Sequence, residues 1–293
     1  MRSKLFVPGS RPELFAKAMA GEADALSFDL EDAVDESRKA EARRELAKFL
    51  RGLPANHGKT IIVRVNGLDT PHFEADLEAV VGPGLDIVNL PKCEGRDDVR
   101  ACAAALTKFE RKARVEPADI MPNIETPRAL RLAAEIAAAG QRVVGLQIGW
   151  ADLIEPLGID RYYPAAIEAI QLQVRIAAGE AGIWAYDGAY ANIKDPDGYR
   201  REAEVARRLG FIGKSAIHPS QVPIANAVFR PTDEEIAHSL KVIEAARLNA
   251  ERGVGAFTVN GRMVDAPFIR RAEAILELAR RLKLVASEER TIQ

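Results

Sequence analysis

The stretch Thr60-Ile-Ile-Val-Arg-Val65 is apolar at almost every position, as is typical of a parallel strand covered on both faces. Seven further runs of this kind lie before and after it: Leu5–Val7, Ala25–Phe28, Leu85–Leu90, Ile120–Ile124, Val143–Ile148, Ile183–Tyr186 and Phe211–Ile217. Helical patterns separate them, for example over Glu36–Leu50, Arg128–Ala139 and Pro164–Ala178. Eight strands that alternate with helices over about 220 residues predict an α/β fold, the (βα)8 TIM barrel.

A doubly wound open sheet is the rival architecture. It usually carries a glycine-rich phosphate loop after its first strand, and this chain has Val7-Pro-Gly-Ser-Arg-Pro12 at that place. We predict the catalytic barrel over residues 1–228 and a C-terminal helix–hairpin–helix extension over residues 229–293. In the extension, Thr232-Asp-Glu-Glu235 predicts a helix start and Asn260-Gly261 predicts a hairpin turn. We expect it to pack on the barrel or on a neighbouring subunit.

Composition limits the classes of partner. The 293 residues include 41 Lys and Arg and 43 Asp and Glu, well mixed, so there is no basic stripe for nucleic acid and no cluster for a membrane surface. The two cysteines match neither a zinc motif nor a disulfide framework, which favours a reducing compartment. With no signal-peptide pattern at Met1–Gly9 and no membrane-spanning run, we expect a cytoplasmic protein.

Polar residues recur where the predicted strands end. From Asp32, steps of 27 to 35 residues lead through Arg64, Lys92, Glu125, Asp152, Asp187 and His218. One βα unit of a barrel takes about 30 residues, and the active site of a barrel lies at the carboxyl ends of its strands. These groups are therefore expected to meet at one mouth.

Glu125 and Asp152 end neighbouring strands, so their carboxylates are expected to reach one point at this solvent-facing mouth. Two oxygen ligands without nearby Cys or His suit Mg²⁺, which keeps further positions for water or substrate. The alternative is that Glu125 caps the helix that begins at Thr126-Pro127 and that Asp152 caps a turn.

Arg64 interrupts an apolar strand and needs an acidic partner, because burying an unpaired guanidinium is costly. It either forms a structural ion pair with Asp29, Glu31 and Asp32 or clamps a substrate carboxylate through two hydrogen bonds, and both can hold together. The three acids are expected to orient Arg64 and metal-bound waters beside the substrate.

Three other groups at the mouth leave their roles open. His218 is equally compatible with a structural and a catalytic role. Lys92 and Lys214 either bind phosphate or pair with local acids, and a place beside the substrate is slightly favoured for Lys92.

Several motifs together resemble the citrate lyase β-subunit and malyl-CoA lyase family. They are Arg2–Gly9, Asp29-Leu-Glu-Asp-Ala-Val34, Arg64-Val-Asn66, Ile124-Glu-Thr126, Gly149-Trp-Ala-Asp-Leu153, Gly210–Gln221 and Gly261-Arg-Met-Val-Asp-Ala-Pro267. The resemblance covers nearly the whole chain. It implies a TIM barrel, Mg²⁺ held by Glu125 and Asp152, Arg64 on the substrate carboxylate, CoA or acyl-carrier thioester substrates, and a homotrimer or hexamer.

The resemblance also implies a role for Asp265 in the extension. The matching residue of the family enters a neighbouring subunit's active site and handles the proton on the methyl carbon of the thioester. The simpler interpretation is that Asp265 caps the helix that begins near Pro267. Trp150 departs from the family pattern, which usually reads Gly-Ala-Glu-Asp, and this bulky residue is expected to reshape the acid pocket.

The predicted activity is magnesium-dependent cleavage or formation of a carbon–carbon bond in a 2-hydroxy dicarboxylic acyl thioester such as malyl-, citramalyl- or citryl-CoA. One alternative is a thioesterase or a malate-synthase-like enzyme on the same site. The other is a non-catalytic barrel subunit of a carrier-protein complex, which would be expected to have lost Glu125, Asp152 or Arg64.

Overall fold

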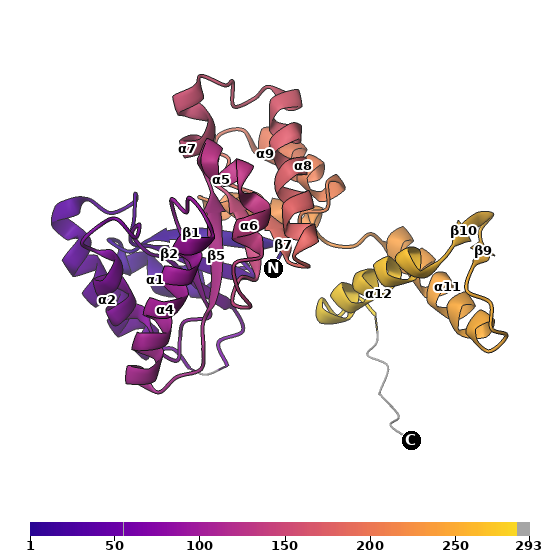
Figure 1. The fold of residues 1–293 in the computed structure, drawn as a ribbon, viewed down its shortest axis with the longest axis horizontal. Coiled ribbons are helices and arrows are strands. Elements are labelled where there is room, and N and C mark those ends of the chain that lie inside the picture. Colours follow the sequence, from indigo (N-terminus) through magenta and orange to yellow (C-terminus); the bar gives the residue numbers. More distant parts are fainter. Residues whose placement is uncertain (55, 286–293) are drawn as a thin grey trace. The chain divides into compact units, whose positions relative to one another are not determined.

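The structure, a computed structural model, describes residues 1–54 and 56–285. They divide into an N-terminal unit, which ends at Phe229, and a C-terminal unit, which begins at Arg230 (Figure 1). The N-terminal unit holds eight parallel strands, in the order β7-β6-β5-β4-β3-β2-β1-β8. A bridge between Asp187 and Lys214 joins β7 to β8 and closes the sheet. The predicted (βα)8 barrel is confirmed. Its strands are β1 (Ser3–Pro8), β2 (Ala25–Asp29), β3 (Thr60–Arg64), β4 (Ile87–Leu90), β5 (Asp119–Ile124), β6 (Gly145–Ile148), β7 (Trp184–Tyr186) and β8 (Lys214–Ala216).

The helices of this unit follow the strands and cover the outside of the sheet. They are α1 (Phe15–Ala20), α2 (Lys39–Arg51), α3 (Phe73–Val80), α4 (Arg96–Ala113), α5 (Pro127–Arg131), α6 (Ala133–Ala137), α7 (Trp150–Ile154), α8 (Pro164–Glu180), α9 (Pro196–Arg208) and α10 (Val222–Val228). Short 3₁₀ turns are η1 (Pro12–Leu14), η2 (Glu36–Arg38), η3 (Glu155–Leu157) and η4 (Pro219–Gln221). The single helix predicted over Arg128–Ala139 is wrong, because Leu132 leaves helical geometry and separates α5 from α6.

Alternation along the strands sorts side chains between two environments. Leu26, Phe28, Ile61 and Val63 belong to the large apolar core, to which Leu46 of α2 also contributes. The opposite face of each strand points into the barrel. Hydrophobic burial of this kind, at roughly 25 cal/mol per Å², is the main force that holds the helices against the sheet.

The barrel interior changes in polarity from floor to mouth. Its floor is apolar and contains Ala25, Ile62, Ile87, Met121 and Tyr186. Two residues further along these strands, on the same face, the side chains are polar and buried: Ser27, Asn89 and Asn123. Arg64 belongs to this step, because it pairs with Asn89, and the acids Asp29 and Glu125 follow two residues after Ser27 and Asn123.

The C-terminal unit is a pair of packed helices with a hairpin between them in sequence, as predicted. Helix α11 (Asp233–Ala250) begins with a complete capping box between Thr232 and Glu235. Strands β9 (Phe257–Val259) and β10 (Arg262–Val264) turn at Asn260-Gly261, both with positive φ, and α12 (Ala266–Arg281) packs beside α11 (Figure 1). Within residues 1–54 and 56–285, no helix combines the length and apolar character needed to span a bilayer.

Candidate active site

A cavity of ≈480 Å³ lies where the strands end, as expected for a barrel enzyme. Five predicted site residues line it: Asp29, Asp32, Arg64, Glu125 and Asp152. An adjoining cavity of ≈350 Å³ shares Asp32 and is lined by Glu31 and Lys92. The two cavities therefore bring together seven of the predicted site residues, whereas Asp187, Lys214, His218 and Asp265 line neither of them.

Glu125 follows β5 directly and is only 2% exposed, so the prediction that it faces solvent is wrong. Its Oε1 accepts a hydrogen bond from the backbone N–H of Lys92, and its Oε2 accepts one from Asn123 Nδ2 at 2.9 Å. The helix-cap alternative is also wrong, because the Thr126 side chain caps α5. Burial raises the pKa of Glu125, so its ionised form lacks full charge compensation.

Gly149 explains how the next strand end approaches Glu125 so closely. A Cβ atom at Gly149 would lie 2.5 Å from the Cβ of Glu125, which no side chain tolerates. Asp152 lies three residues further on, exposed, in the first turn of α7, and its charge contributes to the raised pKa of Glu125. The glycine thus lets the two carboxylates share one side of the cavity.

The donor set fits a magnesium ion that completes its coordination with water and substrate. A carboxylate offers about four lone-pair sites, and the two N–H groups on Glu125 use two of them. Within the described residues there is no group of three or more His, Cys, Asp or Glu side chains arranged as a metal site. A hard cation on two carboxylates plus substrate oxygens is the arrangement expected of Mg²⁺ rather than of a zinc site enclosed by the protein.

Arg64 is clustered with all three predicted acids. Its Nε and Nη2 donate to the two carboxylate oxygens of Asp29 at 2.8 and 2.5 Å, and Nη1 lies 2.8 Å from Glu31 and 3.4 Å from Asp32. The Nε–Nη2 edge of the guanidinium is therefore occupied by Asp29. The Nη1–Nη2 edge is the one left for a further carboxylate, which would compete there with Glu31 and Asp32.

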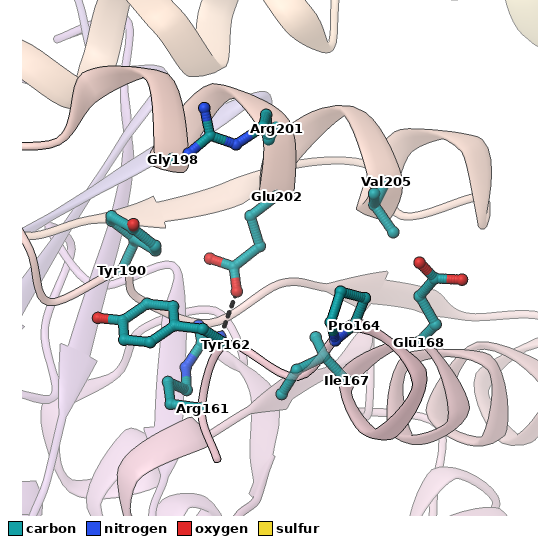
Figure 2. A pocket seen from close by; sticks show the side chains of 10 residues that line it. All are labelled: Arg161, Tyr162, Pro164, Ile167, Glu168, Tyr190, Gly198, Arg201, Glu202 and Val205. Carbon is teal, nitrogen blue, oxygen red and sulfur yellow. Dashed lines mark hydrogen bonds and ion pairs between the residues drawn. The ribbon is translucent and has the colours of Figure 1, made fainter.

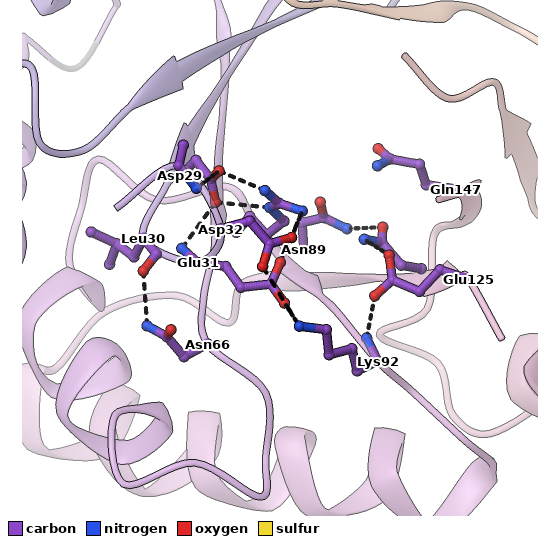
Figure 3. A network of polar contacts seen from close by, with 12 residues as sticks. Asp29, Leu30, Glu31, Asp32, Asn66, Asn89, Lys92, Glu125 and Gln147 are labelled. Atoms are coloured by element: carbon purple, nitrogen blue, oxygen red, sulfur yellow. Dashed lines mark hydrogen bonds and ion pairs between the residues drawn. The ribbon is translucent and has the colours of Figure 1, made fainter. Parts of the chain in front are cut away.

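Figure 3 shows how these acids and Lys92 face one another. Lys92 Nζ lies 3.0 Å from Glu31 Oε1, while the backbone N–H of Lys92 holds Glu125. Burial raises the pKa of Glu31 to about 7, although Arg64 and Lys92 oppose the shift. For Asp29, the charge and hydrogen bonds of Arg64 outweigh burial and lower the pKa. The site thus combines a carboxyl group of lowered pKa, Asp29, with one whose pKa is about 7, Glu31.

Buried side-chain amides, which were not predicted from the sequence, extend this network toward the floor of the barrel. Asn89 Nδ2 donates to Asn123 Oδ1 at 2.8 Å, and Asn123 in turn donates to Glu125. The chain of amides fixes the orientation of the Glu125 carboxylate from below. The available signal was a polar residue at alternate positions of otherwise apolar strands.

A cluster of buried polar side chains holds Trp150 in place at the other side of the cavity. Trp150 Nε1 donates to Asp187 at 3.1 Å, and Lys214 Nζ lies 2.5 Å from Asp187 and 3.1 Å from Glu202. Glu202 pairs with Arg161, shown in Figure 2, whose guanidinium lies 4.7 Å from the centre of the Trp150 ring. Lys214 is therefore a buried partner of local acids, and Trp150 is a fixed wall of the cavity.

Asp187 and His218, which the strand-end series also contains, line neither cavity: Asp187 is fully buried, and His218 is exposed. The His218 ring accepts a hydrogen bond from the Ser220 N–H and caps η4, which supports its structural role.

Asp265 lies in the C-terminal unit, at the start of α12. Its side chain makes no capping hydrogen bond, and Oδ1 is buried without a hydrogen-bond partner in the described structure. The contact that a capping role requires is thus absent.

Comparison with known proteins identifies a family. A sequence profile of the HpcH/HpaI aldolase/citrate lyase family matches residues 2–219. Citrate lyase subunit beta of Escherichia coli K12 is 38% identical over 282 residues, which cover 95% of this chain and 93% of the relative. L-malyl-CoA/beta-methylmalyl-CoA lyase of Cereibacter sphaeroides is 34% identical over 300 residues, covering 95% and 94%.

Solved structures give the same result. Protein CitE from Mycobacterium tuberculosis, crystallised with magnesium, acetoacetate and coenzyme A, has a TM-score of 0.75 and 34% identity, covering 95% of this chain and 99% of that one. The citrate lyase beta subunit from the same organism, complexed with oxaloacetate and magnesium, has a TM-score of 0.66 and covers 78% of this chain.

Proposed function

The chain belongs to the HpcH/HpaI aldolase/citrate lyase family, and from that premise we propose that it is a magnesium-dependent carbon–carbon lyase acting on acyl thioesters of 2-hydroxy dicarboxylic acids. The observation that carries the proposal is the convergence of Glu125, Asp152 and Arg64 on one cavity at the strand ends. Relatives whose names include citrate lyase and malyl-CoA lyase, and structures with magnesium and coenzyme A, support the same chemistry.

Glu125 and Asp152 would hold the cofactor, Mg²⁺. When bound, it supplies Lewis-acid polarisation of the hydroxyl or keto oxygen of the acid. The amides of Lys92 and Asn123 keep Glu125 oriented toward the cavity. Arg64 binds a carboxylate of the acid and is itself held in place by Asp29.

Asp265 is proposed as the group that exchanges the proton on the methyl carbon. In cleavage, the hydroxyl group loses its proton to solvent and its carbon becomes a keto carbon. The electron pair of the broken bond passes to the α-carbon of the thioester, and protonated Asp265 donates its proton to that carbon. In condensation, Asp265 removes that proton, the resulting carbon nucleophile attacks the keto carbon, and the keto oxygen takes up a proton from solvent. This role requires an assembly, trimeric or hexameric, in which Asp265 reaches a neighbouring barrel.

The activity is tested with a panel of thioesters. We expect incubation with Mg²⁺ and malyl-, citramalyl- or citryl-CoA to release a 2-oxo acid and a shorter acyl-CoA from at least one substrate, with products identified by mass. Chelation of the metal should stop the reaction. Release of free CoA together with an intact hydroxy acid would instead identify a thioesterase, and no turnover of any substrate would contradict the proposal.

Arg64→Lys keeps the positive charge but loses the planar fork. We expect kcat/KM for the dicarboxylic thioester to fall about 100-fold, because two charge-assisted hydrogen bonds are lost. The melting temperature should also fall, because the fork to Asp29 is lost at the same time.

Arg142→Lys is the matched control for Arg64→Lys. Arg142 makes a comparable two-point ion pair with Glu110, at 2.7 and 2.6 Å, away from the cavity. This variant should lower the melting temperature while leaving kcat/KM unchanged. Unchanged kinetics in Arg64→Lys, with a lower melting temperature, would show that Arg64 has a structural role alone.

A further inference from the structure

A lysine is buried in the interior of the barrel, below the proposed metal ligands. Lys4 on β1 is 0% exposed, and its Nζ lies 4.3 Å from the centre of the Phe6 ring. Its described hydrogen bond goes to Gln147 Oε1 on β6. Because β7 and β8 lie between β6 and β1 in the closed sheet, this bond crosses the barrel. Ordering a buried amine in this way is costly, so the contact calls for an explanation in terms of function.

The contact fixes the orientation of the Gln147 amide. An amide oxygen only accepts, so Lys4 must be the donor; burial lowers the pKa of Lys4 well below its usual value, but both forms of the amine can donate. With Oε1 turned to Lys4, the Nε2 donor of Gln147 is directed elsewhere. No residue in the described structure accepts a hydrogen bond from it, although Gln147 is only 3% exposed.

Gln147 lines the main cavity, so a ligand bound there can accept a hydrogen bond from its free Nε2–H group. Figure 3 shows its side chain directed toward the same space as that of Glu125. In the sheet, Gln147 pairs with Asn123, two residues before Glu125, so it lies one layer deeper than the proposed metal ligand. The nearby amides of Asn89 and Asn123 already donate to protein oxygens. Gln147 therefore presents the available amide donor of this deeper layer.

We propose that Gln147 determines the specificity for the acid half of the substrate, by donating its Nε2–H to an oxygen at the end of the acid that extends past the metal ligands into the barrel. Lys4 is a positioning residue that keeps the amide in this orientation. The inference rests on the proposed function, since it assigns the acid to this cavity. It identifies the acid as one whose far end carries a hydrogen-bond acceptor, of which a second carboxylate is the strongest example.

Binding of two 2-oxo acids in the presence of Mg²⁺ tests the inference. Oxaloacetate has a carboxylate at the far end, and pyruvate has a methyl group there. For Gln147→Leu, calorimetry should show that the Kd for oxaloacetate rises about 10- to 100-fold, as expected for the loss of a hydrogen bond to a charged group. The Kd for pyruvate should change less than about 3-fold, because the methyl group accepts no hydrogen bond.

Two further variants separate recognition from folding. Gln147→Glu keeps a partner for Lys4 but presents a carboxylate to the cavity, so oxaloacetate should bind more weakly than to Gln147→Leu. Lys4→Met frees the amide to turn, and the preference for oxaloacetate over pyruvate should fall at least about 5-fold, an effect that a purely structural role would not produce. Gln171→Met is the control, because it removes a buried glutamine on α8 that does not line the cavity, and it should leave both Kd values unchanged.

Equal weakening of both acids by Gln147→Leu, or no weakening of either, would overturn the inference alone. If the wild-type chain binds neither acid with Mg²⁺, the inference and the proposed function both fail. Preserved oxaloacetate preference in Lys4→Met would contradict the positioning role of Lys4.

Discussion

Asp152→Asn is expected to abolish magnesium-dependent cleavage, with kcat falling about 1,000-fold or more. A metal that acts as Lewis acid contributes several kcal/mol to transition-state stabilisation, and each 1.36 kcal/mol changes the rate about tenfold. The side chain is exposed, so the melting temperature should stay the same. Calorimetric titration with Mg²⁺ alone should show that the variant binds the ion much more weakly.

Glu125→Gln should lose activity to a similar extent, but with a change in stability. Both oxygens of Glu125 accept N–H groups, and a glutamine has only one such oxygen, so one donor would face an NH₂ group. An unsatisfied buried donor costs about 1–3 kcal/mol, partly offset because a charge is no longer buried. Activity should therefore be measured well below the melting temperature.

Glu135→Gln is the control for both variants. Glu135 is a surface acid that pairs with Arg96 at 3.0 Å, and its neutralisation should change neither Mg²⁺ binding nor turnover. Near-normal turnover of Asp152→Asn or Glu125→Gln at limiting Mg²⁺ would remove the metal assignment.

The barrel and the cavity were predictable because they depend on repeated, local signals. A buried parallel strand is apolar along its whole length, as in Thr60–Arg64, and the units recur at a nearly constant period that places strand ends at one mouth. The hairpin followed from Asn260-Gly261, where both residues adopt positive φ. Each of these features can be recognised within a few residues of sequence.

The features that were missed depend on contacts between distant residues. The bond from Lys4 to Gln147 joins positions 143 residues apart and exists only because the sheet closes. The burial of Glu125 depends on the approach of Gly149 from the next strand. A third example is the buried ion pairing of Lys214 with Asp187 and Glu202, which keeps Lys214 away from the mouth of the barrel. No local pattern distinguishes such residues from exposed polar groups at strand ends.

Asp265→Asn is expected to reduce turnover about 100- to 10,000-fold, the usual contribution of a positioned acid or base, while substrate binding stays intact. A capping role predicts the opposite, because Asn caps a helix about as well as Asp. The structure favours the first outcome, since the Asp265 side chain makes no capping bond and Oδ1 is buried without a hydrogen-bond partner in the described structure. Turnover and binding of a non-cleavable substrate analogue should be measured on the same sample.

Thr232→Ala provides the control within the same unit. Thr232 caps α11 through a complete capping box, so its loss should cost about 1 kcal/mol of stability without lowering turnover. If Thr232→Ala reduced activity as strongly as Asp265→Asn, the effect of Asp265 would reflect the integrity of the C-terminal unit rather than proton transfer.

Subunit mixing tests whether Asp265 acts on a neighbouring barrel. Asp265→Asn keeps the proposed metal site, and Asp152→Asn keeps Asp265, so each variant alone is expected to be inactive. If every site combines the barrel of one subunit with Asp265 of the next, random 1:1 mixing makes about one quarter of the sites complete, and about that share of wild-type activity should return. If Asp265 acts within its own subunit, every site carries one of the two substitutions and no activity returns. Mass spectrometry of the intact assemblies must show mixed oligomers, and their inactivity would rule out a shared site.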